Sequence, residues 1–151
     1  MIYYALAIFV VLLDQISKYV VSHAMNVGDN IPIIPNVFYI TSLRNSGAAW
    51  SILEGRMLFF YIISIVVLVV VIYYMQKLGR FKPLLGTSLG LIIGGTLGNF
   101  IDRLLHGQVV DFIHVYIGSY SYPIFNLADS ALCIGAVLLL IYSIVDSKKE
   151  K

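Results

Sequence analysis

The 151-residue chain is 60% hydrophobic and only 12% charged, with a mean hydropathy of +0.90. Because soluble globular domains carry about 25% charged residues, this composition excludes an ordinary soluble domain and favours an integral membrane protein. The formal net charge of +2 is too small to indicate nucleic-acid binding. The single cysteine, Cys133, excludes an intrachain disulfide. It lies in an apolar segment, where we expect a small core residue.

The first predicted transmembrane helix spans roughly residues 2–21. No Lys or Arg precedes its apolar run, and Ser22-His23-Ala24 matches a cleavage site only weakly, so a retained helix is favoured over a cleaved signal peptide. Asp14 and Lys18 interrupt this helix. Because they are four residues apart, they share a helix face and are expected to form an ion pair. In the alternative interpretation, Lys18 extends towards the membrane surface.

Residues 24–56 differ in kind from this helix and are predicted to form a small β-rich element outside the hydrocarbon. Two prolines prevent a helix, and residues 37–43 are β-branched and aromatic, which is typical of a strand. The element ends in the run Arg44-Asn45-Ser46-Gly47-Ala48-Ala49-Trp50. Trp50 is expected to be an interfacial anchor.

Three further apolar segments are long enough to span about 30 Å of hydrocarbon, and they cover roughly residues 57–75, 84–105 and 124–145. The third span has glycine at every fourth position, which lets a neighbouring helix approach closely; these are Gly86, Gly90, Gly94 and Gly98. Residues 106–123 are predicted to form a non-spanning loop. The chain is therefore expected to be one mainly α, integral membrane domain over residues 1–151.

The distribution of basic residues predicts how the four helices cross the membrane. An even number of spans places both termini on one side, together with the loop over residues 76–83. That loop and the C-terminal tail hold Lys77, Arg80, Lys82, Lys148, Lys149 and Lys151, whereas the opposite loops hold only Arg44 and Arg56. Because positive charge favours the cytoplasm, we expect both termini to be cytoplasmic. The β-element and the loop over 106–123 are then extracytoplasmic.

With this orientation, every ionisable group inside the predicted helices falls near the outer face. Asn99, Asp102 and Arg103 share one helix face near the end of the third span, and Asn126 and Asp129 share one at the start of the fourth. Polar groups in hydrocarbon are costly and point to function by default. We therefore expect a single polar site among the helices, open to the outside.

The available chemistry indicates a pair of carboxylates. The sequence has no His-Glu-x-x-His motif and no credible metal cluster, and His23, His106 and His114 are expected to lie outside the site. Two close aspartates share one proton, so one acts as base while the other polarises a carbonyl, which suits peptide hydrolysis. Asp129 is one member, and spacing leaves its partner open between Asp102 and Asp111. Alternatively, these carboxylates only join helices through hydrogen bonds.

Five short motifs, taken together, resemble lipoprotein signal peptidase, also called signal peptidase II. The resemblance covers essentially the whole chain. In chain order the motifs are Asp14-Gln15-Ile16-Ser17-Lys18, the run from Arg44 to Trp50, Gly98-Asn99-Phe100-Ile101-Asp102-Arg103, Val109-Val110-Asp111-Phe112 and Phe125-Asn126-Leu127-Ala128-Asp129.

The resemblance implies an aspartic endopeptidase of the bacterial plasma (inner) membrane that cuts prolipoproteins before a diacylglyceryl-modified cysteine. It implies a catalytic dyad of Asp111 and Asp129, with no cofactor and no metal. Other positions are implied to line the substrate site, where the antibiotic globomycin also binds, or to support it. The lining residues are Asn45, Asn99, Arg103 and Asn126, and the supporting residues are Asp14, Lys18 and Asp102.

The resemblance also implies the parts around this site. Residues 24–56 become a β-cradle at the outer leaflet, and the loop over 106–123 becomes a lid. The expected partners are the prolipoprotein and membrane lipid, and the expected state is a monomer. The alternative function is a small proton-coupled transporter using Asp102, Arg103 and Asp129. It is disfavoured because the inner halves of the spans are almost purely apolar. A presenilin-type protease is also disfavoured, since no Gly-x-Gly-Asp motif is present.

Overall fold

The computed structural model describes residues 1–47 and 53–147, so the expected anchor Trp50 lies outside the described part. The described residues form four long helices and four strands. In chain order the elements are α1 (Ile2–Ala24), β1 (Asn30–Ile34), β2 (Phe38–Asn45), α2 (Met57–Lys77), the 3-10 turn η2 (Gly79–Phe81), α3 (Pro83–His106), β3 (Val109–Ile117), β4 (Tyr120–Ser121) and α4 (Leu127–Ser147).

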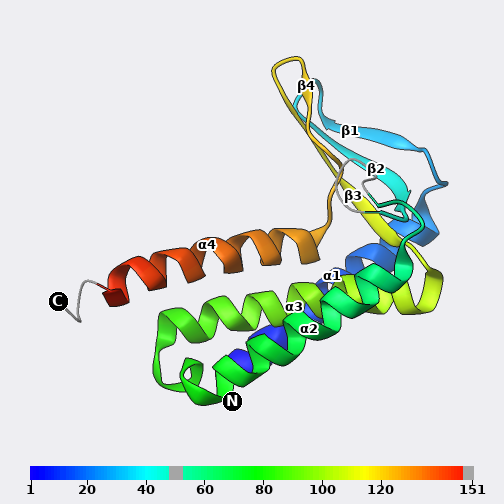
Figure 1. Ribbon diagram of the computed structural model, residues 1–151. Coiled ribbons are helices and arrows are strands. Elements are labelled where there is room, and N and C mark those ends of the chain that lie inside the picture. The colour runs from blue at the N-terminus through cyan, green and yellow to red at the C-terminus, as the bar shows by residue number, and fades with distance from the viewer. Residues whose placement is uncertain (48–52, 148–151) are drawn as a thin grey trace.

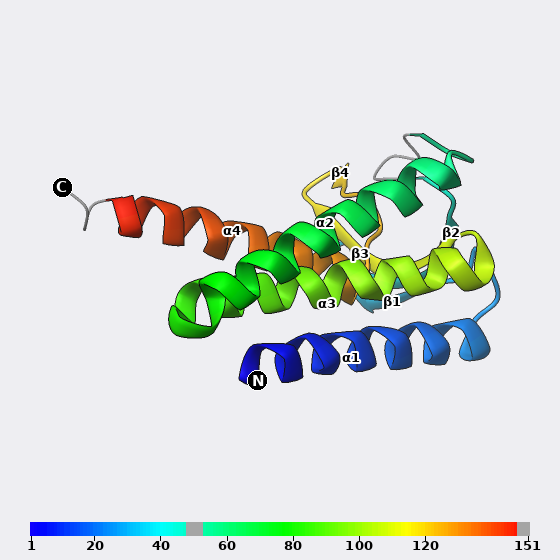
Figure 2. The same ribbon diagram turned by 60° about the horizontal axis from the view of Figure 1, so that its bottom comes forward.

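The four helices are each long and apolar enough to cross a membrane, which confirms the expected fold class. Figures 1 and 2 show the helices side by side, with the sheet standing at one end of the bundle and the start of α1 and the end of α4 at the other. We call these the sheet end and the terminal end. The structure therefore places the start of α1 and the end of α4 at the same end of the bundle.

Helix α3 is the centre of the bundle and packs against α1, α2 and α4. In its most apolar window 67% of the residues are buried, against 22% or less in the other three helices. The glycine ladder explains this position, because all four of its members lie against α1. A Cβ added at Gly90 would meet the backbone oxygen of Tyr3 at 2.7 Å, and one at Gly94 would meet Val10 at 2.7 Å. Small residues therefore let the helix backbones approach closely.

The prediction of a loop over residues 106–123 is wrong, because most of these residues form strands. β3 pairs antiparallel with β2, and the four strands lie in the order β1-β2-β3-β4. The register sets Tyr39 opposite His114 and Leu43 opposite Asp111. β3 is rich in β-branched and aromatic residues, as strands are. A two-stranded ribbon is only marginally stable, so the cradle needs β3 as its third strand.

Helix α4 begins at Leu127, three residues later than expected. Phe125 instead pairs with Ile113 of β3, through backbone hydrogen bonds of 2.8 and 3.1 Å. This pairing holds the chain extended until the helix starts. Cys133 lies on the exposed side of α4. The expectation of a core residue is wrong because only one side of α4 faces the bundle.

We expect Gly94→Val to lower the thermal midpoint of the detergent-solubilised protein. The new side chain would meet Val10 and the Ala7 backbone oxygen, and overpacking of this kind costs about 1–3 kcal/mol. The control is Ala136→Val, which adds the two methyl groups of valine on the exposed side of α4. Equal midpoints for the two variants would contradict close packing of α1 on α3.

Candidate active site

The start of α4 is fixed by a reciprocal hydrogen-bonded cap. The Asp129 backbone N–H donates to Asn126 Oδ1 at 2.9 Å, and the Asn126 backbone N–H donates to Asp129 Oδ2 at 3.1 Å. This is the geometry of a capping box, here made by Asn at the N-cap and Asp at the third position of the helix. The cap therefore fixes the Asp129 carboxylate at the N-terminus of the helix.

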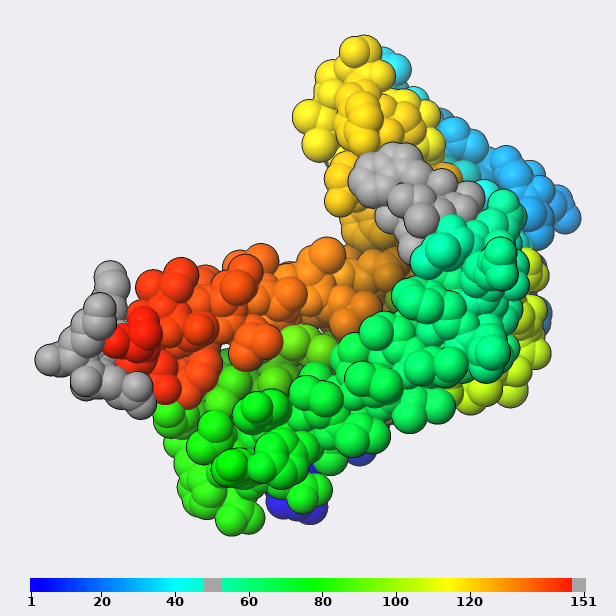
Figure 3. Space-filling view, in the orientation of Figure 1, coloured from blue at the N-terminus to red at the C-terminus, as the bar shows by residue number. Residues whose placement is uncertain are grey.

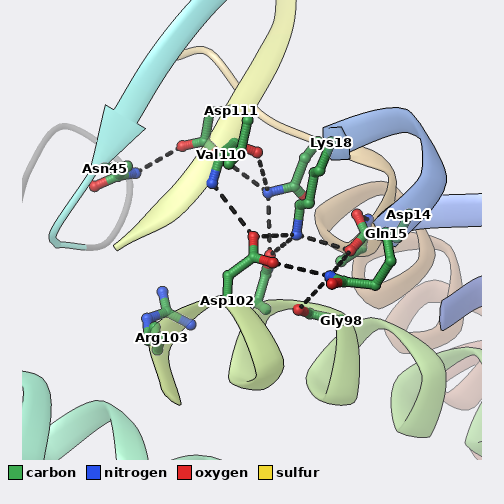
Figure 4. Close-up of polar contacts among 12 residues, drawn as sticks. Asp14, Gln15, Lys18, Asn45, Gly98, Asp102, Arg103, Val110 and Asp111 are labelled. Carbon is green, nitrogen blue, oxygen red and sulfur yellow. Dashed lines mark hydrogen bonds and ion pairs between the residues drawn. The ribbon is translucent and has the colours of Figure 1, made fainter. Parts of the chain in front are cut away.

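Asp111 lies near the start of β3 and is joined to this cap by Asn126. The Asn126 Nδ2 group donates to Asp111 Oδ1 at 2.7 Å, and Asn45 Nδ2 of β2 donates to Asp111 Oδ2 at 2.8 Å (Figure 4). Asp111 is only 2% exposed. Burial raises the pKa of Asp111 to about 6, and the nearby charge of Asp129 acts in the same direction. The one side chain of Asn126 thus contacts both aspartates.

Lys18 of α1 binds three partners inside the bundle. Its Nζ lies 2.7 Å from Asp14 Oδ2 and 2.9 Å from Asp102 Oδ2, and it donates to Asn99 Oδ1 at 2.9 Å. Lys18 is 3% exposed, so the ion pair with Asp14 is confirmed and the alternative of a surface-reaching lysine is wrong. The Asn99 Nδ2 group in turn donates to Asp129 Oδ1 at 2.7 Å. Lys18 therefore connects to Asp129 through the amide of Asn99.

Gln15 is a member of this network that the sequence did not single out. Its Nε2 donates to Asp102 Oδ1 at 2.8 Å and to the Gly98 backbone oxygen at 3.2 Å (Figure 4). Asp102 also accepts from the Val110 backbone N–H at 3.3 Å. The contact of Gln15 with Asp102 cannot be predicted from its position beside Asp14, because neighbours in a helix point about 100° apart. Only the crossing of α1 over α3 brings it to Asp102.

Arg103 stands apart from the Lys18 network. Figure 4 shows it on the far side of Asp102 from Lys18. Its guanidinium lies 4.5 Å from the Phe60 ring centre, and its Nη2 donates to the Gly47 backbone oxygen at 3.4 Å. The buried Nε atom has no hydrogen-bond partner within the described residues. The side chain is therefore held in place with a donor still unused.

The two aspartates share one cavity of about 440 Å³. Its polar lining includes Asn45, Asn99, Arg103, Asp111 and Asp129, whereas Asp102 is not among the lining residues. The rest of the wall is largely apolar and includes Val115, Ile117, Tyr122, Ile124 and Phe125. In Figure 3 the β3–β4 hairpin, in yellow, projects away from α4, in orange, and leaves an open angle between them.

This arrangement suits general acid–base chemistry on a substrate with an apolar part. One aspartate with a raised pKa faces another at a helix N-terminus, within one cavity. Of the two candidates for the partner of Asp129, Asp111 lines this cavity and Asp102 faces Lys18 instead. Within residues 1–47 and 53–147, no group of three or more His, Cys, Asp or Glu side chains is arranged to hold a metal ion.

Comparison with known proteins gives one family and close structural relatives. The family model described as signal peptidase (SPase) II matches residues 6–145. One solved structure, described as a bacterial membrane enzyme, is 44% identical with a TM-score of 0.93, covering 99% of this chain and 91% of that chain. Another, with the same description, is 46% identical with a TM-score of 0.84, covering 92% and 90%.

We expect the stability of the protein to depend on pH through Asp111. Its folded-state pKa of about 6 lies above the ordinary 3.8, so the folded state holds the proton more tightly than the unfolded state. The resulting stabilisation is complete below the ordinary pKa and is lost as pH rises through the folded value; it is on the order of 3 kcal/mol at most.

Thermal midpoints of wild type and Asp111→Asn between pH 4 and pH 8 test this expectation. The asparagine does not titrate, so the wild-type midpoint should fall relative to that of the variant as the pH rises. Parallel curves over this range would contradict the raised pKa.

Lys18→Met should destabilise the protein strongly, by about 3–5 kcal/mol, because it leaves two buried carboxylates without their cation. The control is Lys77→Met, which removes the same charge from an exposed position on α2. Thermal midpoints in detergent at pH 7 measure the difference. Similar losses in the two variants would show that the buried ion cluster does not hold the bundle together.

Proposed function

The chain belongs to the signal peptidase II family, and we propose that it is an aspartic endopeptidase of that type. It is a peptidase that processes the signal peptides of lipoproteins in a membrane. In this proposal it cuts the prolipoprotein just before a cysteine that carries diacylglyceryl. The observation that carries the aspartic mechanism is the shared cavity of Asp111 and Asp129, joined by hydrogen bonds from Asn126.

In the proposed mechanism Asp111 holds the proton of the pair and Asp129 is the base. Asp129 accepts a proton from water, and the water oxygen adds to the carbonyl carbon while Asp111 protonates the carbonyl oxygen. Collapse of the gem-diol returns that proton to Asp111, and the proton on Asp129 passes to the leaving nitrogen. The raised pKa of Asp111 supports its role as acid, which leaves Asp129 as the base of the pair.

The remaining site residues are assigned by what they contact. Asn45 and Asn126 orient Asp111, and Asn99 orients Asp129. Arg103 lines the same cavity, and in this proposal its guanidinium binds a substrate carbonyl. The apolar wall under the hairpin receives the lipid-bearing part of the substrate. Asp14, Lys18 and Asp102 support this arrangement without contacting the substrate.

We place the enzyme in the bacterial plasma membrane, with both termini cytoplasmic and the active site near the outer face. The charge distribution of the loops supports this orientation. Asp129 is the third residue of α4, so the cavity lies within about one helix turn of the sheet end. A monomer suffices because one chain supplies both aspartates. An inhibitor of the globomycin type would occupy this cavity and compete with the substrate.

The alternative of a proton-coupled transporter finds no support in the position of the buried charges. The Lys18 cluster and the dyad lie towards the sheet end, and the ion pair of Lys82 with Asp146 lies at the terminal end. Between these two levels the helices carry no Asp, Glu, Lys, Arg or His. A proton relay would need such groups along its path.

Asp111→Asn and Asp129→Asn should each abolish cleavage of a diacylglyceryl-modified prolipoprotein, reducing the rate by at least about a thousandfold. The amides cannot exchange the proton that the mechanism requires. The control is Asp29→Asn, an exposed aspartate outside the cavity. Gel shifts of the purified substrate measure the rate, and thermal midpoints confirm folding. Wild-type turnover by either dyad variant would rule out the aspartic mechanism.

A further inference from the structure

A second cavity, of about 560 Å³, lies at the sheet end between α1, α3 and the base of the sheet. Its lining is rich in polar groups that the proposed reaction does not use. They include Lys18, Ser22 and His23 of α1, Arg44 of β2, and Asp102 and His106 of α3. We call it the α1–α3 cavity.

The two cavities lie on opposite faces of the same elements. Successive residues of a strand point to opposite faces. Accordingly, Asn45 lines the dyad cavity and Arg44 the α1–α3 cavity. β3 repeats the pattern, because Asp111 lines the first and Val110 the second. The chain thus builds two separate polar hollows with the Lys18 network between them.

The α1–α3 cavity descends from the sheet end into the apolar part of the bundle. His23 and His106 lie in the last turns of their helices, and Gln15 lines the cavity further down α1. Eight residues separate Gln15 from His23, so the polar lining is about 12 Å deep. A polar hollow of this depth beside hydrocarbon is unfavourable unless a polar group fills it.

The charges in this cavity indicate where an anion would bind. Arg44 is half-buried and donates to Ser22 Oγ at 3.0 Å and to the Leu43 backbone oxygen at 3.5 Å. Over the described ranges, none of the ion pairs includes Arg44. The floor, in contrast, holds Asp102, whose carboxylate is already paired with Lys18. An anion therefore fits at Arg44, and polar headgroup atoms fit towards the pair of Asp102 and Lys18. A guanidinium is well matched to a phosphate.

The surroundings of the cavity favour a lipid as the source of that phosphate. Tyr19, which lines it, is 63% exposed, and the neighbouring Val20 and Leu105 are 55% and 70% exposed. In a bilayer these apolar surfaces lie against acyl chains. We propose that the α1–α3 cavity binds the headgroup of a phosphoglyceride, with the phosphate at Arg44 and the headgroup hydroxyls towards Asp102. Free phosphate offers the same anion without the chains.

The test is a binding titration of the purified full chain in detergent, read by native mass spectrometry. The probes are a short-chain phosphatidylglycerol, the matching diacylglycerol without phosphate, and inorganic phosphate. The variants are Arg44→Gln and its control Arg56→Gln, which removes the same charge from an exposed position at the start of α2. His106→Gln gives a second test, should Arg44→Gln fail to fold.

We expect phosphatidylglycerol to bind wild type and Arg56→Gln equally, and to bind Arg44→Gln about tenfold more weakly. His106→Gln should also weaken binding. Diacylglycerol should not compete. If inorganic phosphate displaces the lipid at equal concentration, the cavity is an anion site, but a lipid is not its ligand. If diacylglycerol binds as tightly as phosphatidylglycerol, the proposed site is wrong. The same holds if phosphatidylglycerol binds wild type and every variant with equal affinity. None of these experiments measures cleavage, so their result is independent of the proposed peptidase activity.

Discussion

The ammonium of Lys18 is the contact on which the rest of this structure depends. It lies against two buried carboxylates, from α1 and α3, and it donates to the Asn99 amide that holds Asp129. Asp14 extends the same network to α4, since it accepts the Ala128 backbone N–H at 2.9 Å. One cation thus ties three helices together at the level of the proposed dyad. Because its partners would be costly to leave unpaired in hydrocarbon, the network fixes the helices in a single arrangement.

Close helix packing makes this network possible. The side chain of Asp14 fits against Gly98, where an added Cβ would lie 2.6 Å from its Oδ2. Gly95 likewise leaves room for the backbone of α4 beside Ala128. The glycine ladder therefore does more than pack helices, because it sets the distance at which side chains of α1 and α4 meet those of α3. The sheet then completes the site at the sheet end of the bundle, since β3 places Asp111 beside the capped start of α4.

Local chemistry made much of this predictable from the sequence. Four apolar segments gave the helices, and i, i+4 spacing gave the pair of Asp14 with Lys18. The capping box of Asn126 and Asp129 is also local, but the apolar run from residue 124 predicted both residues inside the helix. The sequence predicts a loop where β3 lies, because this stretch connects two spans and the strand's partner β2 is about 70 residues away. Spacing also leaves open whether Asp102 or Asp111 is the partner of Asp129. The crossing of α1 over α3 decides this, because it places Asp102 against Lys18, and no local pattern encodes that crossing.

The measurement that tests the central claim most directly offers the purified enzyme one prolipoprotein in two forms, with and without diacylglyceryl on its cysteine. Wild type and Asp129→Asn are compared in the same lipid, and the size shift of the substrate is followed. The account predicts that wild type cleaves only the lipidated form and that the variant cleaves neither. Cleavage of the unmodified form, or cleavage by the variant, would contradict an aspartic site built beside a lipid-accommodating wall.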